Sequence, residues 1–347
     1  MQTRRYRVIY ICLAVAIVLL FLANILFGAV NIPIGDAVRI LFGWAGEGVR
    51  PSWQHIILES RLPQSVTAVL AGSSLAISGL LLQTLFKNPL AGPSILGVSN
   101  GANLGVAIVM LSFGGMPQIV AGGVFSGYLA IVSAALVGAG AVLGVIIYFS
   151  SRVRSNTMLL IVGIMVGYMV SSLISILNFK ASSDKVHAFV MWGMGDFSSV
   201  SNEKLPYFAL FALFGIVISL LLTKSLNALL LGEMYAENLG VRVKRTRMLI
   251  LLATGVLTAA TTAFCGPVSF IGLAVPHIAR LVLKTSNHNH LLPMALLCGA
   301  AIALLCNLLC VVWGDNQIFP LNAITPIIGA PVIIYVIVNR KNIQYFN

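Results

Sequence analysis

Apolar residues in this chain occur in long runs that are separated by short polar stretches. A helix needs about 20 apolar residues to cross the hydrocarbon core of a bilayer. Ten runs approach or exceed that length, and they cover residues 8–29, 62–86, 97–113, 119–149, 157–179, 205–223, 248–265, 268–283, 291–312 and 321–338. The eighth and tenth are short and interrupted by proline or glycine, and the fourth requires a strong tilt. The pattern predicts an all-α integral membrane protein with about ten transmembrane helices, several short or broken, in a single domain over residues 1–347.

Composition indicates the same class of protein. Hydrophobic residues make up 59% of the chain and charged residues 9%, whereas a soluble globular protein carries about 25% charged residues. So few charges cannot cover a surface that faces water. The 32 glycines suit closely packed transmembrane helices. The five cysteines lie in or beside apolar runs without a Cys-x-x-Cys pair, which is typical of small buried hydrophobic residues.

The placement of charge predicts how the chain crosses the membrane. If the N-terminus is inside, the inner segments hold 15 of the 21 Lys and Arg residues but only two of the nine acids. This is the positive-inside pattern, and it places both termini in the cytoplasm. The outer loops are then residues 30–61 and 180–204. Because topology accounts for the net charge of +12, no nucleic acid is expected as a partner.

The predicted spans carry almost no ionisable residues, apart from Arg280 and Lys284 at the inner end of the eighth. Proton- or sodium-coupled carriers usually need such a group near the middle of the membrane. The pattern favours an energy source on another subunit, with an ion-coupled secondary transporter as a distant alternative. The sequence has no Gly-x4-Gly-Lys-Ser/Thr phosphate loop, no His-Glu-x-x-His and no intramembrane carboxylate pair. We therefore expect no enzyme activity, no metal site and no cofactor.

Residues 224–247 form the longest stretch that is both polar and strongly basic. The pattern predicts two short helices, Leu226–Leu231 and Glu233–Leu239, with a break at Gly232 and an end at Gly240. Five basic residues lie at or near the ends of this stretch: Lys224, Arg242, Lys244, Arg245 and Arg247. Two short helices on the cytoplasmic face would offer a soluble partner a surface to bind. The alternative is an ordinary basic loop that only fixes the topology.

The motif Gly-Glu-x-x-Ala-x-x-Leu-Gly-Val at residues 232–241 resembles the coupling loop of a family of importer permeases. These permeases import iron–siderophore complexes, haem and cobalamin with an ABC-type ATPase. The resemblance implies that residues 224–247 are a cytoplasmic coupling loop whose matching residues fit the ATPase: Gly232, Glu233, Ala236, Leu239 and Gly240. It also implies a homodimer or a paralogous pair of permeases, two ATPase subunits and an external substrate-binding protein, at the inner membrane of a bacterial cell.

A second family signature covers residues 79–102 and contains Lys-Asn-Pro-Leu at 87–90. By resemblance, Asn88 and Leu90 lie at the inner gate of the translocation path, and Asn156 and Thr157 form the other part of that gate. For Asn88 the alternative is a residue that merely caps the helix connection. For Asn156 it is a plain N-cap of the fifth span.

Two arginines are predicted to dock the external binding protein. Glu-Ser-Arg-Leu-Pro-Gln at residues 59–64 resembles an Arg-Leu-Pro-Arg signature of the family, with Gln64 in place of the second arginine. Arg61 matches the first arginine, and Arg50 lies in the loop before it. The alternative for Arg61 is a residue that caps the interface or pairs with Glu59.

The order of the spans also predicts an internal repeat. Spans two to five begin outside and spans seven to ten begin inside, and each block has a Gly-Pro break between its first two spans, at 92–93 and 266–267. This is the pattern of an inverted repeat, in which broken helices flank a central path. By resemblance we expect a permease for a bulky metal chelate, iron–siderophore first, with cobalamin or haem as the alternative.

Overall fold

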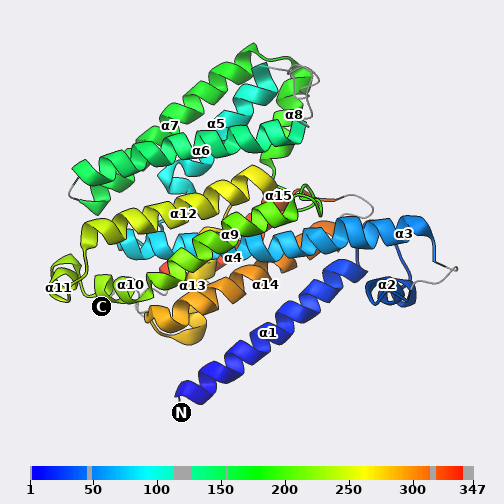
Figure 1. Ribbon diagram of the computed structural model, residues 1–347, viewed down its shortest axis with the longest axis horizontal. Coiled ribbons are helices and arrows are strands. Elements are labelled where there is room, and N and C mark those ends of the chain that lie inside the picture. The colour runs from blue at the N-terminus through cyan, green and yellow to red at the C-terminus, as the bar shows by residue number, and fades with distance from the viewer. Residues whose placement is uncertain (1, 45–48, 113–126, 154, 313–317, 339–347) are drawn as a thin grey trace.

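The computed structural model describes residues 2–44, 49–112, 127–153, 155–312 and 318–338, and within these ranges every regular element is a helix. In chain order the elements are α1 (Gln2–Leu26), α2 (Ile34–Leu41), α3 (Pro51–His55), η1 (Ile56–Arg61), α4 (Leu62–Phe86), η2 (Pro93–Leu96), α5 (Val98–Ala107), η3 (Ile108–Ser112), α6 (Gly127–Arg152), α7 (Asn156–Lys180), α8 (Ser183–Gly193), α9 (Leu205–Leu221), α10 (Thr223–Leu230), α11 (Glu233–Asn238), α12 (Val243–Cys265), α13 (Ile271–Leu283), α14 (His288–Val312) and α15 (Leu321–Val338). Figure 1 shows the long helices side by side, with α4 through the middle of the bundle.

Each of the ten predicted runs contains a helix. Within the described ranges, six helices are long and apolar enough to cross a membrane alone, and the pair α9–α10, bent by 51°, makes a seventh if it is one span. Helices α5–η3, α13 and α15 are apolar but shorter. The multi-pass helical class is thus confirmed, whereas the count of ten stays a prediction. Residues 119–126, the start of the fourth predicted run, lie outside the described residues.

The second span differs from its prediction at its outer end. It extends without a break from Pro51 to Phe86, because Pro51 occupies the first turn of α3, where proline is favoured, and the π-helical turn η1 joins α3 to α4. The first outer loop therefore contributes helix to this span, and α2 is a separate short helix in the same loop.

Small residues hold the centre of the bundle together. At Gly72 in α4 the chain lies against the backbone of Gly299 in α14, and at Gly79 it lies against Gly272 in α13. A Cβ atom at position 79 would stand 1.6 Å from the Gly272 carbonyl oxygen. Since lipid is as apolar as a leucine side chain, helices in a membrane associate through such close backbone approach.

The packing of the helices confirms the inverted repeat. Helix α4 packs on α13 and α14, and α12 packs on α5 and α6 in the same way. Helix α5 contacts α6 and α7, just as α13 contacts α14 and α15. In Figure 1, α4 and α12 run in opposite directions beside each other. Exchange of the block α4–α7 with the block α12–α15 therefore preserves the contacts, as an inverted repeat requires.

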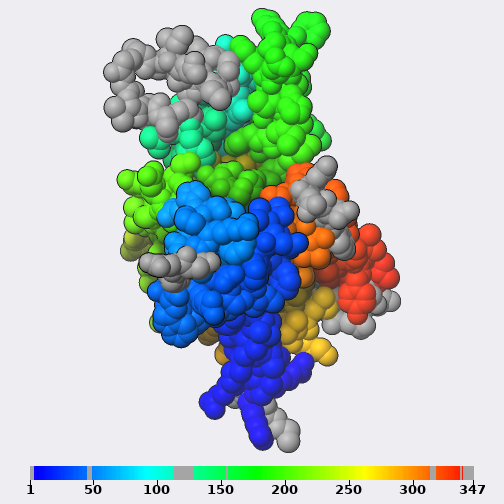
Figure 2. Space-filling view, turned by 90° about the vertical axis from the view of Figure 1, so that its right-hand side faces the viewer, coloured from blue at the N-terminus to red at the C-terminus, as the bar shows by residue number. Residues whose placement is uncertain are grey.

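The two ends of the bundle differ. At one end α2, α3 and η1 pack on the end of α1 around a small separate core that includes Ile25, Ile40 and Ile57. Figure 2 looks onto this end, where the blue α2–α3 region covers the centre. At the opposite end α10 and α11 lie beside the starts of α7, α12 and α14. We call this second end the loop end.

Candidate functional site

The coupling segment, residues 224–247, consists of most of α10, all of α11 and the start of α12. Gly232 has φ 111°, a backbone conformation that favours glycine, and it turns the chain between α10 and α11. Gly240 has φ 83°, and the amides of Gly240 and Val241 donate to the carbonyls of Glu237 and Ala236. These two bonds form a Schellman motif. The predicted helix pair is confirmed, with each helix ending one residue earlier than expected.

Helix α11 exposes an apolar surface to its surroundings. Ala236 is fully buried against the bundle, whereas Leu239 is 65% exposed. Three further large apolar residues are exposed beside it: Leu231, Met234 and Tyr235. Exposed basic residues flank the segment: Lys224, Arg242, Lys244 and Arg245. An apolar patch with a polar rim is typical of a surface that binds another protein.

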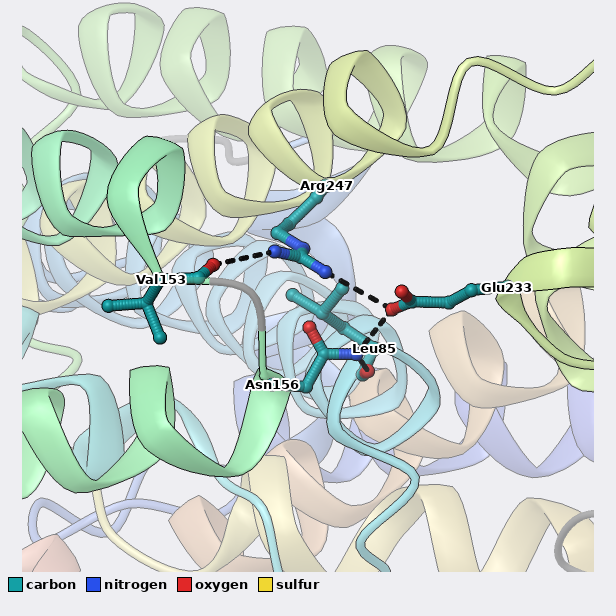
Figure 3. Close-up of polar contacts among 5 residues, drawn as sticks. All are labelled: Leu85, Val153, Asn156, Glu233 and Arg247. Carbon is teal, nitrogen blue, oxygen red and sulfur yellow. Dashed lines mark hydrogen bonds and ion pairs between the residues drawn. The ribbon is translucent and has the colours of Figure 1, made fainter. Parts of the chain in front are cut away.

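The buried side of the coupling segment contacts the start of α7 and the end of α4 (Figure 3). Asn156 Nδ2 donates to Glu233 Oε1 at 2.8 Å and to the carbonyl oxygen of Leu85 at 3.0 Å. Arg247 donates to the same Glu233 oxygen at 3.1 Å and to the carbonyl oxygen of Val153 at 3.3 Å. Through Asn156 and Arg247, one carboxylate of α11 thus connects the starts of α7 and α12 with the end of α4 and with Val153, which follows α6.

This cluster leaves one donor and one acceptor open. Asn156 Oδ1 and Arg247 Nε are both buried and have no hydrogen-bond partner. A buried polar atom without a partner costs about 1–3 kcal/mol. The two groups are complementary, and in Figure 3 the Asn156 oxygen lies on the side that faces Arg247. Both open groups therefore lie in the same polar cluster, one as a donor and the other as an acceptor.

The first predicted gate segment is a tight turn after α4. Lys87 has φ 47° and ends the helix, and Asn88 Oδ1 accepts the amide of Leu90 at 2.9 Å. Asn88 therefore stabilises its own turn, in agreement with the capping alternative, which does not exclude a place at the gate. His277 Nε2 lies 2.8 Å from the carbonyl oxygen of Pro89. The side chain of Leu90 is 43% exposed.

The second predicted gate segment, Asn156 and Thr157, contacts the end of α4, the helix that leads into the first gate segment. Asn156 bonds to Leu85, three residues before Asn88, while Thr157 is exposed. The N-cap of α7 is Ser155 rather than Asn156. The plain N-cap alternative for Asn156 is therefore wrong, because its side chain reaches away from its own helix to α4 and α11.

A cavity of about 270 Å³ lies between the two Gly-Pro breaks. It is lined by Leu75, Leu90, Gly92, Pro93, Ser94, Ile95, Ser99, Val268, Ser269, Phe270, Gly272 and Leu273. The only polar side chains in this lining are serine hydroxyls, and none of the residues is charged. The predicted gate residue Leu90 thus lines the same cavity as residues beside the Gly-Pro breaks of both repeats.

Arg61 has contacts that its motif did not predict. Its side chain is only 5% exposed, and its guanidinium donates to the carbonyls of Ile25, Leu26 and Val30 at the end of α1. A cation at a helix C-terminus satisfies carbonyls that have no partner within the helix. Arg61 therefore fixes α1 to the second span, and its docking role stays a prediction. Arg50 is exposed and lies 5.0 Å from the Trp53 ring centre.

Sequence reasoning missed a second polar connection at the loop end. Asn227 Oδ1 of α10 accepts the backbone amide of His288 at 2.8 Å and lies 3.1 Å from His288 Nδ1. His288 Nε2 in turn lies 2.9 Å from Thr84 Oγ1, in the last turn of α4. Thr84 lies in the signature at residues 79–102 and Asn227 in the stretch 224–247, but neither motif indicates their connection through His288. The available signal was a polar residue at the start of an otherwise apolar run.

Among the described residues, no group of three or more His, Cys, Asp or Glu side chains is placed to hold a metal ion. Four of the five cysteines are buried, and Cys12 is exposed. The residues that carry the site are therefore amides, hydroxyls and a single ion pair. Such groups position helices and bind surfaces, and they offer no nucleophile or general base paired for chemistry.

A multi-pass helical bundle with an inverted repeat, broken helices at its centre and an exposed apolar patch on a short helix at one end defines a transporter subunit of the membrane-permease class. The chain belongs to the FecCD transport family, which matches residues 16–339. It is 33% identical over 336 residues to the molybdate import system permease protein MolB of Haemophilus influenzae, with 95% of each chain covered. It is 32% identical over 298 residues to the vitamin B12 import system permease protein BtuC of Klebsiella pneumoniae, with 85% of this chain and 86% of that protein covered.

The fold matches a solved structure described as an inward-facing metal-chelate type ABC transporter, with a TM-score of 0.81 and 28% identity. That match covers 96% of this chain and 99% of the other. The protein is thus a permease subunit of an ABC importer, and its partner ATPase hydrolyses ATP. The predicted family, fold class and non-enzymatic role are confirmed.

Proposed function

We propose that this permease imports a bulky metal chelate and that its coupling segment transmits the state of the ATPase to the gate. The observation that carries the proposal is the two-sided structure of α11. Its outer side exposes Leu239 and neighbouring apolar residues. Its inner side places Glu233 on Asn156, one of the predicted gate residues. A partner bound to the outer side would therefore act on the gate through a single short helix.

The uncharged lining of the cavity beside the two breaks, where the predicted gate residue Leu90 lies, supports a chelate as the cargo. None of the described residues that line the cavity is charged, and most are apolar. A bare oxyanion in such a lining would lose its water without gaining a counter-charge, which is costly. A chelate that encloses its metal in an organic shell presents neutral and apolar surface instead. Iron–siderophore is our first candidate within this class, with haem as an alternative.

Cobalamin is the second candidate, because several relatives over 85% or more of this chain are named vitamin B12 import permeases. The name of MolB, a molybdate importer, shows that relatives at this distance differ in cargo. Identity alone therefore does not select a cargo, and the lining of the cavity is the better guide. It favours both organic chelates over free molybdate.

The proposed orientation follows from charge. The loop end carries the basic residues of the coupling segment, and the positive-inside rule assigns such an end to the cytoplasm. We propose that both termini are cytoplasmic, that the membrane is the bacterial inner membrane, and that two permeases, two ATPases and an external binding protein assemble. The binding protein would then meet the α2–α3 end, where Arg50 is exposed.

We propose that coupling works through an exchange of hydrogen-bond partners in the Glu233 cluster. When the ATPase draws α11 away from the bundle, Glu233 leaves Asn156 and Arg247. Asn156 Oδ1 and Arg247 Nε, which have no partner in the present arrangement, then pair, and the start of α7 moves with respect to α4. ATP binding can shift the equilibrium between the two gate states only by the difference in the free energy with which the ATPase binds them.

Reconstitution tests this function. Purified permease in vesicles, with its ATPase and binding protein, should accumulate chelate only when ATP is present. The coupling-segment variants Leu239→Ala, Glu233→Ala and Gly240→Pro should lower uptake per ATP hydrolysed, while the permease still inserts and remains folded. Accumulation without the ATPase would support an ion-coupled carrier instead. Normal coupled uptake by these variants would reject the role of the coupling segment.

A binding assay on the cognate binding protein tests the cargo. Iron–siderophore complexes, haem, cobalamin and molybdate are compared at equal concentration, and uptake is then measured for those that bind. We expect an organic chelate to bind and be transported. Transport of molybdate alone would contradict the argument from the cavity and leave the assignment as an ABC importer permease intact.

A further inference from the structure

An apolar groove runs along the outside of the bundle between α1 and α13, with α14 as its floor. Its volume is about 420 Å³. Val8, Cys12 and Ala16 line it from α1, Ile278 and Val282 from α13, and Ala301 is among the lining residues of α14. Figure 1 shows α1 lying alongside α14, apart from the rest of the bundle. Because no charged or amide side chain lines the groove, water gains no partners there.

The mouth of the groove is cationic. Arg4 lies one helical turn before Val8, and Lys284 follows Val282 by two residues, so both walls of the groove end in a base at the loop end. Arg5, four residues before the lining residue Ile9, adds a third positive charge. All three side chains are exposed.

No acid neutralises these bases from within the same elements. The sequence has no Asp or Glu between residues 1 and 35, or between residues 238 and 314. These ranges include α1, α13 and α14 in full. An apolar channel that ends in uncompensated cations has the chemistry of a phospholipid with a negative headgroup. Basic pockets between membrane helices on the cytoplasmic side bind anionic lipid headgroups for this reason.

We propose that this groove is a binding site for an anionic phospholipid, with one acyl chain between α1 and α13 and the phosphodiester on Arg4, Arg5 and Lys284. The site would hold α1, which packs mainly on α14, against the rest of the bundle. It lies on a different face from the Glu233 cluster, and the proposal does not depend on the cargo or on the coupling mechanism.

A second copy of the chain is a poorer occupant. A two-fold interface places the same patch of both subunits together. Pairing through this groove would therefore bring two sets of the same cations into one contact without an acid to separate them. A lipid phosphodiester supplies the missing negative charge.

Native mass spectrometry of the full importer tests the proposal. The complex is purified in a mild detergent with equal amounts of phosphatidylglycerol and phosphatidylcholine that have the same acyl chains. We expect the native protein to retain phosphatidylglycerol with a preference of roughly tenfold, in line with several basic contacts to one anionic lipid. The triple variant Arg4→Gln, Arg5→Gln, Lys284→Gln should lose most of this preference.

The matched control removes three exposed bases from other helices, outside the coupling segment: Arg39→Gln, Arg152→Gln and Lys180→Gln. It should keep the preference, which separates a site from a general attraction to positive charge. Filling the groove with Ala301→Phe should lower retention of both lipids. Because Ala301 is mostly buried and this change can disturb the fold, Ala16→Leu, at a half-buried position, serves as the second filling variant.

Three results would overturn the proposal. The first is equal retention of the two lipids by the native protein. The second is an equal loss of preference in the control triple variant. The third is efficient disulfide cross-linking of Cys12 between two copies of the chain in membranes, because it would show that protein, and not lipid, covers the groove.

Discussion

Helices α4 and α7 are both 25 residues long and both apolar, yet one is buried and the other is exposed. Twenty residues of α4 are buried, compared with four of α7. Between residues 71 and 79 α4 is made almost entirely of Ala, Gly and Ser. Helix α7 carries large apolar side chains, such as Met165 and Tyr168, that face outward.

The difference shows that apolar content does not decide what is inside a membrane protein. Lipid accepts leucine and methionine as readily as a protein core does, so the helices at the centre are those whose small residues allow close approach. The buried residues of α7, Leu159, Gly163, Gly167 and Val170, form one narrow stripe. Its other faces are available to lipid or to a second permease, as a wall of a path between two copies would be.

The largest expected difference between α4 and α7 comes from replacing one glycine in each helix by alanine, which adds one methyl group. At Gly79 the new Cβ would meet the Gly272 carbonyl oxygen at 1.6 Å, so Gly79→Ala should cost more than about 3 kcal/mol of unfolding free energy or prevent folding. At Gly167 the nearest atom is the flexible Asn100 amide at 3.0 Å, and Gly167→Ala should cost well under half as much. Thermal unfolding in detergent compares them. Similar losses would contradict the contrast between α4 and α7.

A cavity made in each helix sharpens the same contrast. Leu80 is fully buried, and Leu80→Ala should cost about 2–3 kcal/mol because the packing around α4 cannot collapse into the space. Met165 is 54% exposed, and Met165→Ala should change the stability of the single subunit by less than about 0.5 kcal/mol. Denaturant titration of each variant measures both values. A large loss for Met165→Ala in the isolated subunit would show that α7 is part of the core.

The smallest effect concerns the polar cluster where α7 meets the rest of the bundle. Arg247→Met keeps the length of the side chain but removes its bonds to Glu233 and to the Val153 carbonyl, which should cost about 1–2 kcal/mol. Lys244→Met, in the same first turn of α12, removes an exposed charge and should change little. The same unfolding assay serves both. Equal effects would mean that the cluster contributes no more than any surface charge.

Much of this architecture was predictable because its causes are local. Long apolar runs give spans, and Gly232 and Gly240 break the coupling segment wherever it is placed. The contacts that sequence reasoning did not predict join residues that are far apart in the chain. Arg61 resembled an outward docking residue, yet it contacts the end of α1, some 31 to 36 residues away. Asn156 meets Glu233, 77 residues away, and no periodicity in the sequence encodes that contact.

The contact between Glu233 and Asn156 is the central claim of this account, and a double-mutant comparison tests it most directly. Uptake per ATP hydrolysed is measured in vesicles for Glu233→Ala, Asn156→Ala and the double variant, with Glu237→Ala as an exposed control on the same helix. If the two residues act through one contact, the double variant should lose no more uptake per ATP hydrolysed than the single variant with the larger loss. Losses that multiply in the double variant would show that the two residues act independently, and would contradict the account.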